Sequence, residues 1–225
     1  MTLRIARSAG FTEYEVEPAD GMTILDALEV IRHTREPGLR YRHSCHHGSC
    51  GTCGALVDGK ERLLCITQLA SVGPGPVTIE PLRKTGLVGD LAVDPSRFFA
   101  EMPAGAGYLK SSVSGRRNAI QMEACIECGL CVSACPVTEP FAGPAALAAA
   151  DTDRQSNPAR EAASLEFAAS VRGVEACASH FDCSRVCPQG VAPGRRIAAL
   201  RRSLQQREDA RPLKDGTGRP GGSGS

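Results

Sequence analysis

Cysteine is the residue type through which this sequence could do chemistry, and it occurs eleven times in 225 residues. Eleven is an odd number, and the chain is longer than the small secreted domains that depend on a disulfide framework. Residues 1–10 contain no apolar stretch of the length that a secretory signal needs, so we expect a cytosolic protein. Cytosolic cysteines at this density are more often metal ligands or catalytic groups than disulfides.

A first group of cysteines has the spacing C-x4-C-x2-C-x11-C. It consists of Cys45, Cys50, Cys53 and Cys65. The first three match the spacing of plant-type 2Fe–2S proteins. Gly48, Gly51 and Gly54 let the backbone wrap closely, so that amide N–H groups can point at sulfur. The group therefore predicts a 2Fe–2S cluster.

A zinc site and a Rieske centre are the alternative metal centres for this loop. Zinc usually takes its thiolates in C-x2-C pairs, which the x4 step fits less well. A Rieske centre would need histidines in place of two thiolates, although four cysteines are available here. We interpret His43, His46 and His47 as polar loop surface rather than as ligands.

The remaining seven cysteines form two related runs. The first run, C-x2-C-x2-C-x3-C-P, contains Cys125, Cys128, Cys131, Cys135 and Pro136. The second run contains Cys177, Cys183, Cys187 and Pro188, with His180 in place of the second cysteine. In bacterial ferredoxins the last cysteine of such a run ligates the other cluster. Inert buried thiols are the alternative, which this spacing disfavours.

This exchange of ligands predicts two clusters. A 4Fe–4S cluster would be held by Cys125, Cys128, Cys131 and Cys187. Cys135, Cys177 and Cys183 would hold the other, as a cube that can lose one iron and persist as 3Fe–4S. His180 has three open roles: a ligand to a fourth iron, a hydrogen-bond or proton donor beside the cluster, or a side chain that only fills space.

The elements that must position the first group are predicted by local patterns. Two strands are expected over 2–8 and 11–17, with a turn at Ala9 and Gly10. Thr23 is the expected N-cap of a helix, with Asp26 three residues further on. Asp58 and Gly59 predict a hairpin turn between the segments 54–57 and 61–66, and a last strand is expected over 77–80. Together these elements predict a small α+β domain.

The character of the chain changes after this domain. We expect a 2Fe–2S ferredoxin-like domain over 1–104, a linker over 105–117, a helical domain over 118–210 and a disordered tail or added linker over 211–225. In the helical domain Pro158 and Pro193 each stand where a helix should open.

Charge and hydropathy limit the classes of function that the sequence supports. Lys and Arg number 26 against 25 Asp and Glu, which gives no general argument for binding nucleic acid. No run of 18 apolar residues exists, so no transmembrane segment is expected. The paired arginines at 195–196 and 201–202 are interpreted as a solvated helix face or as a surface for an acidic partner. An iron–sulfur sensor that binds nucleic acid is the alternative.

Five segments, 43–65, 88–99, 125–136, 141–147 and 183–190, resemble the iron–sulfur subunit of succinate dehydrogenase and fumarate reductase. The resemblance extends over residues 2–207. It implies an N-terminal β-grasp ferredoxin domain, a C-terminal all-α dicluster ferredoxin domain, and 2Fe–2S, 4Fe–4S and 3Fe–4S clusters.

The same resemblance implies the partners. The clusters would pass single electrons between an FAD-containing catalytic subunit and a quinone near membrane-anchor subunits, on the cytoplasmic face of a bacterial inner membrane. The chain carries neither a G-x-G-x-x-G fingerprint nor a P-loop, so we expect the dicarboxylate chemistry on the partner subunit. An electron-transfer subunit of another flavoprotein, linked to glycolate or thiols, is the alternative.

Overall fold

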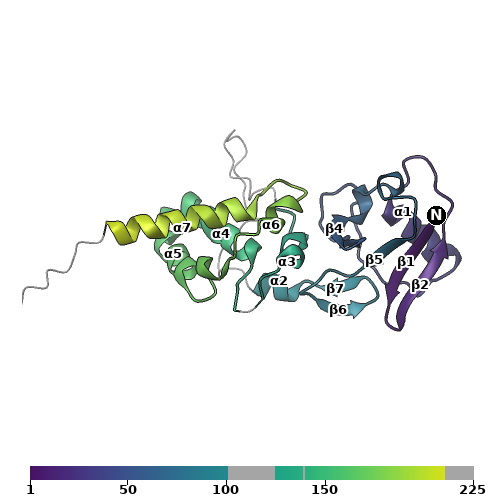
Figure 1. Ribbon diagram of the computed structural model, residues 1–225, viewed down its shortest axis with the longest axis horizontal. Coiled ribbons are helices and arrows are strands. Elements are labelled where there is room, and N and C mark those ends of the chain that lie inside the picture. Colours follow the sequence, from purple (N-terminus) through teal and green to yellow (C-terminus); the bar gives the residue numbers. More distant parts are fainter. Residues whose placement is uncertain (101–124, 139, 211–225) are drawn as a thin grey trace, which may run out of the picture.

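Two structural units lie end to end along the long axis of the protein, a sheet-based N-terminal unit and a helical C-terminal unit (Figure 1). The computed structural model describes residues 1–100, 125–138 and 140–210. The predicted linker over 105–117 and tail over 211–225 lie outside the described residues. The α+β fold class is confirmed.

A mixed five-stranded sheet with the order β2-β1-β5-β3-β4 forms the N-terminal unit. β1 (Thr2–Arg7) pairs antiparallel with β2 (Gly10–Glu15) and parallel with β5 (Val77–Glu80). β3 (Gly54–Val57) pairs antiparallel with both β5 and β4 (Lys60–Leu63). The last strand expected from the sequence thus lies at the centre of the sheet.

The observed turns differ from the predicted ones only in detail. The turn between the first two strands is at Ser8 and Ala9, one residue earlier than expected. Asp58 and Gly59 both have positive φ values, 49° and 74°, as a tight hairpin requires. The segment expected as strand over 61–66 stops at Leu63, because the chain there turns into the 3₁₀ helix η1 (Leu64–Ile66). This turn positions Cys65.

The helix α1 (Ile24–Thr34) packs on the sheet. Its N-cap is Thr23, which accepts a hydrogen bond from the Asp26 amide, while the Asp26 carboxylate accepts from the Thr23 amide. The predicted capping residue is therefore confirmed. One apolar stripe of the helix is buried against the strands; it consists of Ile24, Leu25, Leu28 and Ile31.

A hairpin and a short helix that the sequence did not predict connect the two units. They are β6 (Gly86–Gly89), β7 (Ala92–Asp94) and α2 (Ser96–Ala100). The hairpin is held to the sheet through the buried carboxylate of Asp90. This carboxylate accepts hydrogen bonds from the Arg7 guanidinium and the Arg40 amide, each at 2.9 Å.

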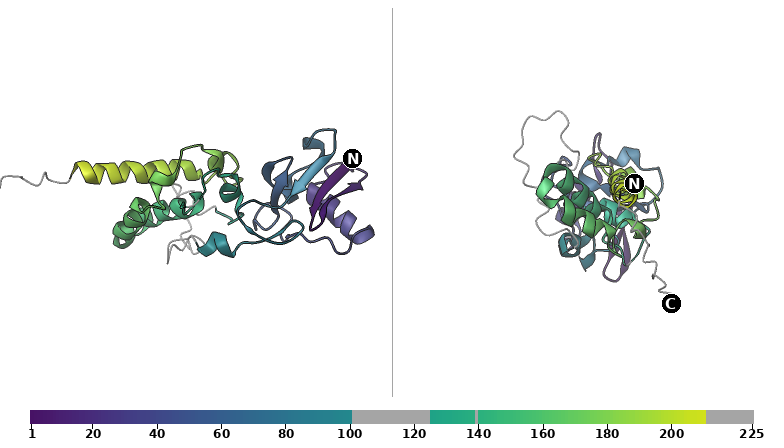
Figure 2. Two further views of the ribbon diagram at one scale, coloured as in Figure 1. Left: turned by 60° about the horizontal axis from the view of Figure 1, so that its bottom comes forward. Right: turned by 90° about the vertical axis from the view of Figure 1, so that its left-hand side faces the viewer.

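The helical unit contains three longer helices packed together (Figure 2). They are α4 (Pro144–Ser156), α5 (Glu161–Ala169) and α7 (Pro193–Asp209). Pro193 opens α7 as expected. Pro158 opens the 3₁₀ turn η4 (Pro158–Arg160) that leads into α5.

Short elements carry the cysteine runs. They are α3 (Leu130–Ala134), η5 (Val174–Ala176) and α6 (Asp182–Arg185). A separate 3₁₀ turn, η2 (Leu69–Ser71), lies in the N-terminal unit. Across the described residues, no helix is both long and apolar enough to cross a membrane.

Candidate iron–sulfur sites

The loop between α1 and β3 directs backbone amides at the sulfur of Cys45. The amides of His47, Ser49 and Cys50 approach its Sγ to 3.5, 3.2 and 3.3 Å. These hydrogen bonds, with that of His47 the largest contribution, lower the pKa of Cys45 to about 6. The N–H groups anticipated from the glycine-rich loop therefore stabilise a thiolate, the form of cysteine that ligates iron.

Cys53 and Cys65 lie deeper in the same site. Burial raises the pKa of Cys53 to about 12, and the neighbouring Cys65 adds to the shift. The Gly48 amide donates to the Cys65 sulfur at 3.2 Å, and the Leu64 amide donates to the Cys53 carbonyl at 3.1 Å. Two of the four thiols are thus buried and two are partly exposed, with Cys45 in contact with Cys50 and Cys53 with Cys65.

The histidines of this loop lie mostly at the surface, as expected. His46 and His47 are exposed. His43 is half-buried, with its ring 3.3 Å from the Glu29 carboxylate and 3.0 Å from the His46 ring. Tyr41 also donates to Glu29, at 2.5 Å, so this edge of the loop is anchored to α1.

Four cysteines from the two runs line a single cavity between α3, α4 and the segment before α7. They are Cys125, Cys128, Cys131 and Cys187. Burial raises the pKa of Cys128 to about 12 and that of Cys131 well above its usual value. The proximity of Cys187 contributes to the raised pKa values of Cys125, Cys128 and Cys131. Cys187 therefore lies beside the first run rather than its own.

The last cysteine of the first run, in turn, lies beside cysteines of the second run. Cys135 lines another cavity together with Cys177 and Cys183. Burial raises the pKa of Cys135 and of Cys183, and in each case the proximity of Cys177 adds to the shift. His180 is exposed and lines the same cavity.

The two runs have similar backbones as well as similar sequences. In the first run Glu127 and Gly129 have φ values of 54° and 75°, and Gly129 is the N-cap of α3. The corresponding residues, Ser179 and Phe181, have φ values of 58° and 63°, and Phe181 is the N-cap of α6. His180 thus occupies the place of Cys128 in a repeated loop.

These donor sets fit iron–sulfur clusters. Thiolates are soft ligands, and the first loop adds several N–H···S contacts that would stabilise a reduced cluster. Among the residues that the structure describes, no group of three His, Cys, Asp or Glu side chains could hold one metal ion. The thiols of a cluster bind different irons and are spaced more widely than the ligands of a single ion.

The first two sites are joined by direct backbone contact. A Cβ atom on Gly51 would lie 2.3 Å from the Ile126 carbonyl oxygen and 3.0 Å from the Cys128 amide nitrogen. Gln189, beside Cys187, donates to the Gly48 carbonyl at 3.0 Å. At Gly51 the backbone of the first loop therefore lies directly against the backbone of the second.

Polar side chains that sequence reasoning missed hold the junction. Ser133, which is 2% exposed, donates to the Glu61 carboxylate at 2.8 Å and accepts from the Arg83 amide at 3.0 Å. Lys84 donates to backbone carbonyls beside Cys135. The partners in these contacts are 50 or more residues apart, and no local pattern in the sequence indicates them.

The fold and the thiol sites define an iron–sulfur protein of two ferredoxin-like parts, and comparison with known proteins agrees. Residues 3–100 match the family of 2Fe-2S iron-sulfur cluster binding domains, and residues 121–191 match the family of 4Fe-4S dicluster domains. The fumarate reductase iron-sulfur subunit of Mycobacterium tuberculosis is 35% identical over 200 residues, which cover 81% of each chain. That of Haemophilus influenzae is 32% identical over 211 residues, 82% of each chain.

A solved structure, the Mycobacterium smegmatis Sdh1 complex in the apo form, contains a similar chain. The TM-score is 0.74 at 25% sequence identity, over 94% of this chain and 98% of that one. The protein belongs to the family of iron–sulfur subunits of succinate dehydrogenase and fumarate reductase. Its role is electron transfer within an oxidoreductase, and neither the nucleic-acid sensor nor the other flavoprotein partners are favoured.

Proposed function

We propose that this chain passes single electrons between an FAD-containing catalytic subunit and a quinone held near membrane-anchor subunits. Relatives named as fumarate reductase and succinate dehydrogenase subunits support the assignment. Bound clusters would supply one-electron chemistry, and the dicarboxylate reaction belongs to the flavoprotein. The chain would then attach peripherally, through its partners, to the cytoplasmic face of the membrane.

The ligand assignment follows the exchange between the two cysteine runs. The proposed 2Fe–2S ligands are Cys45, Cys50, Cys53 and Cys65. The proposed 4Fe–4S ligands are Cys125, Cys128, Cys131 and Cys187. Cys135, Cys177 and Cys183 would hold a 3Fe–4S cluster. The observation that carries the proposal is the position of Cys187, which lines one cavity with three cysteines of the first run.

The protein contributes a low-dielectric setting and fixed donors at each site. Burial keeps water from the deeper thiols, and the amides of the first loop hold the sulfur atoms in place. We also propose 1–104 and 118–210 as the two domains, joined by the linker 105–117. The contact between Gly51 and Ile126 supports electron passage across their boundary.

The exchange of ligands is tested with two serine variants in the anaerobically purified complex. Cys187→Ser should weaken the reduced-state EPR signal of the 4Fe–4S cluster and leave the oxidised-state signal of a 3Fe–4S cluster. Cys183→Ser should weaken the oxidised-state signal of the 3Fe–4S cluster and leave the reduced-state signal of the 4Fe–4S cluster. If Cys187→Ser abolished the 3Fe–4S signal instead, each run would hold its own cluster and the proposal would be wrong.

Whether His180 binds iron determines whether the third cluster is 3Fe–4S or 4Fe–4S. Its exposed position, with three cysteines around the same cavity, favours a non-ligating role and a 3Fe–4S cluster. We expect the oxidised wild-type protein to show a 3Fe–4S signal of about one spin per chain, and His180→Ala to retain it. A wild-type protein without that signal, which gained it in His180→Ala, would identify His180 as the ligand of a fourth iron.

A further inference from the structure

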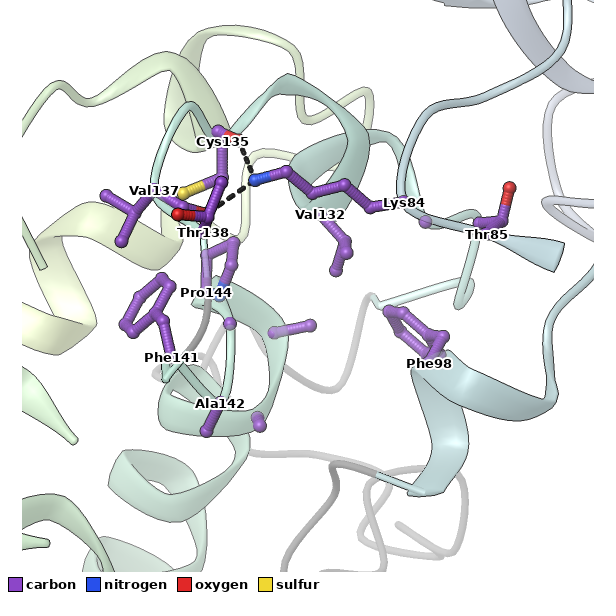
Figure 3. A pocket seen from close by; sticks show the side chains of 14 residues that line it. Lys84, Thr85, Phe98, Val132, Cys135, Val137, Thr138, Phe141, Ala142 and Pro144 are labelled. Carbon is purple, nitrogen blue, oxygen red and sulfur yellow. Dashed lines mark hydrogen bonds between the residues drawn. The ribbon is translucent and has the colours of Figure 1, made fainter. Parts of the chain in front are cut away.

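Lys84 crosses from the N-terminal unit to the third site. It lies in the loop between β5 and β6, and its ammonium donates to the carbonyl oxygens of Cys135 and Val137, the latter at 2.5 Å (Figure 3). Cys135 is a proposed ligand of the third cluster. A cation from one domain is therefore fixed on the backbone of a ligand in the other.

Lys84 is half-buried beside apolar side chains. It lines a cavity of about 240 Å³ whose wall is largely apolar and includes Phe98, Val132 and Phe141. The field of a half-buried charge beside apolar side chains is screened less by water than that of a fully exposed charge. The Lys84 backbone has a φ of 60°, a left-handed conformation that non-glycine residues adopt rarely. The loop is thus shaped so that this side chain points across the boundary.

The second site has the opposite charge beside it. Glu127 follows Cys125 by two residues; its backbone amide opposes the rise in the Cys125 pKa that burial causes, and its carboxylate adds to that rise. Near the third site, Lys84 opposes the rise in the Cys135 pKa that burial causes, whereas Asp182 adds to that rise. Asp182 is itself paired with Arg185. Arg201 contributes a further cation near the third site, since it donates to the Cys177 carbonyl at 2.8 Å.

We propose that Lys84 is a positioning residue that raises the reduction potential of the third cluster. Reduction adds one negative charge to the cluster, and the fixed ammonium favours that charge. Electrons arriving from the 4Fe–4S site would then be drawn toward the third site, which passes them on to the acceptor. The inference rests on the proposed function, because it requires a cluster held by Cys135.

The test is an EPR-monitored redox titration of the purified complex and of four variants. Lys84→Met removes the charge and the hydrogen bonds, Lys84→Gln removes the charge but retains an amide donor, and Lys84→Arg retains the charge. Lys60→Met removes an exposed lysine on the β3–β4 hairpin and serves as the matched control. If Lys84→Met fails to assemble its clusters, Lys84→Gln and Lys84→Arg still decide the outcome.

We expect the equilibrium constant for reducing the third cluster to fall on the order of tenfold in Lys84→Gln, equal to about 59 mV for one electron. Lys84→Arg and Lys60→Met should match the wild type, and the 2Fe–2S potential should stay constant throughout. An unchanged third potential in Lys84→Gln, or an equal shift at the 2Fe–2S cluster, would overturn the inference. A wild-type complex in which no cluster is held by Cys135, Cys177 and Cys183, neither 3Fe–4S nor His180-ligated 4Fe–4S, would instead reject the proposed function, and the inference with it.

Discussion

At the scale of single residues, Gly51 sets how closely the two cysteine loops approach. Its φ is 71°, and a Cβ atom there would meet the Ile126 carbonyl oxygen at 2.3 Å. That oxygen belongs to the backbone and cannot swing aside, so a side chain must displace one loop from the other. We expect Gly51→Ala to lower the free energy of unfolding by about 2–4 kcal/mol, measured by denaturant titration of the cluster-loaded chain.

Gly59 provides the matched control for this substitution. Its φ is 74°, nearly that of Gly51, but a Cβ atom there would meet nothing within 4 Å. Gly59→Ala should therefore lower stability by only about 1 kcal/mol, through backbone strain alone. If the two variants lost the same free energy, the contact between the loops would not contribute to stability.

Residue types at fixed spacing could be interpreted from the sequence because cluster chemistry demands thiolates. The cavity shared by Cys187 and the first run agrees with that interpretation. The contacts of Lys84 could not be predicted, because its partner Cys135 is 51 residues away and no local pattern distinguishes Lys84 from a lysine that points into solvent. Long-range side-chain partners depend on how two units pack, which no local pattern specifies.

At the scale of elements, α4 and α7 are held together by a buried carboxylate. Asp151 is fully buried; it lies 2.8 Å from the Arg154 guanidinium on its own helix and 3.4 Å from that of Arg196 on α7. We expect Asp151→Ala to lower the free energy of unfolding by about 3–5 kcal/mol, because it leaves two partly buried arginines without this partner. Urea unfolding followed by far-UV circular dichroism measures the loss.

A second variant separates this effect from general sensitivity of the helices. Glu208 is exposed near the end of α7. Glu208→Ala should change stability by less than about 0.5 kcal/mol. A loss for Asp151→Ala as small as that for Glu208→Ala would show that the buried ion pairs add nothing net to the packing of α4 on α7.

Elements with strong local signals were predicted, and those without them were missed. The capping box before α1 and the Asp58-Gly59 turn each specify structure within a few residues. The helix α4 is alanine-rich and buried on all sides over its first nine residues, so it has no polar face from which a period could be detected. The β6–β7 hairpin is short and irregular in register, which leaves no alternation to recognise.

At the scale of the whole molecule, the cysteine runs lie on elements too short to be stable alone. α3 has five residues and α6 has four, well below the length at which an isolated helix persists in water. Cluster ligation would supply the missing constraint. We therefore expect the iron-free chain to lose helical circular dichroism and to regain it on anaerobic reconstitution. Equal spectra for the two forms would contradict this dependence on iron.

The hydrophobic core of the N-terminal unit includes a residue from beyond the proposed domain boundary. Leu130 lies between Cys128 and Cys131, in the first of the two cysteine runs, yet it is 1% exposed within the core of the N-terminal unit. Leu147 is fully buried in the separate core of the helical unit. Truncating either side chain to alanine should lower stability by about 2–5 kcal/mol, but in different units.

Leu130→Ala should accelerate thermal loss of the 2Fe–2S visible absorbance, although residue 130 lies 65 positions beyond the last proposed ligand of that cluster. Leu147→Ala, which removes the same atoms, should leave the 2Fe–2S transition unchanged and destabilise only the helical unit. Differential scanning calorimetry combined with absorbance at the melting transition distinguishes the two variants. If Leu130→Ala spared the 2Fe–2S transition, the domains would be independent, and the close contact at Gly51 would have to be maintained by the partner subunits.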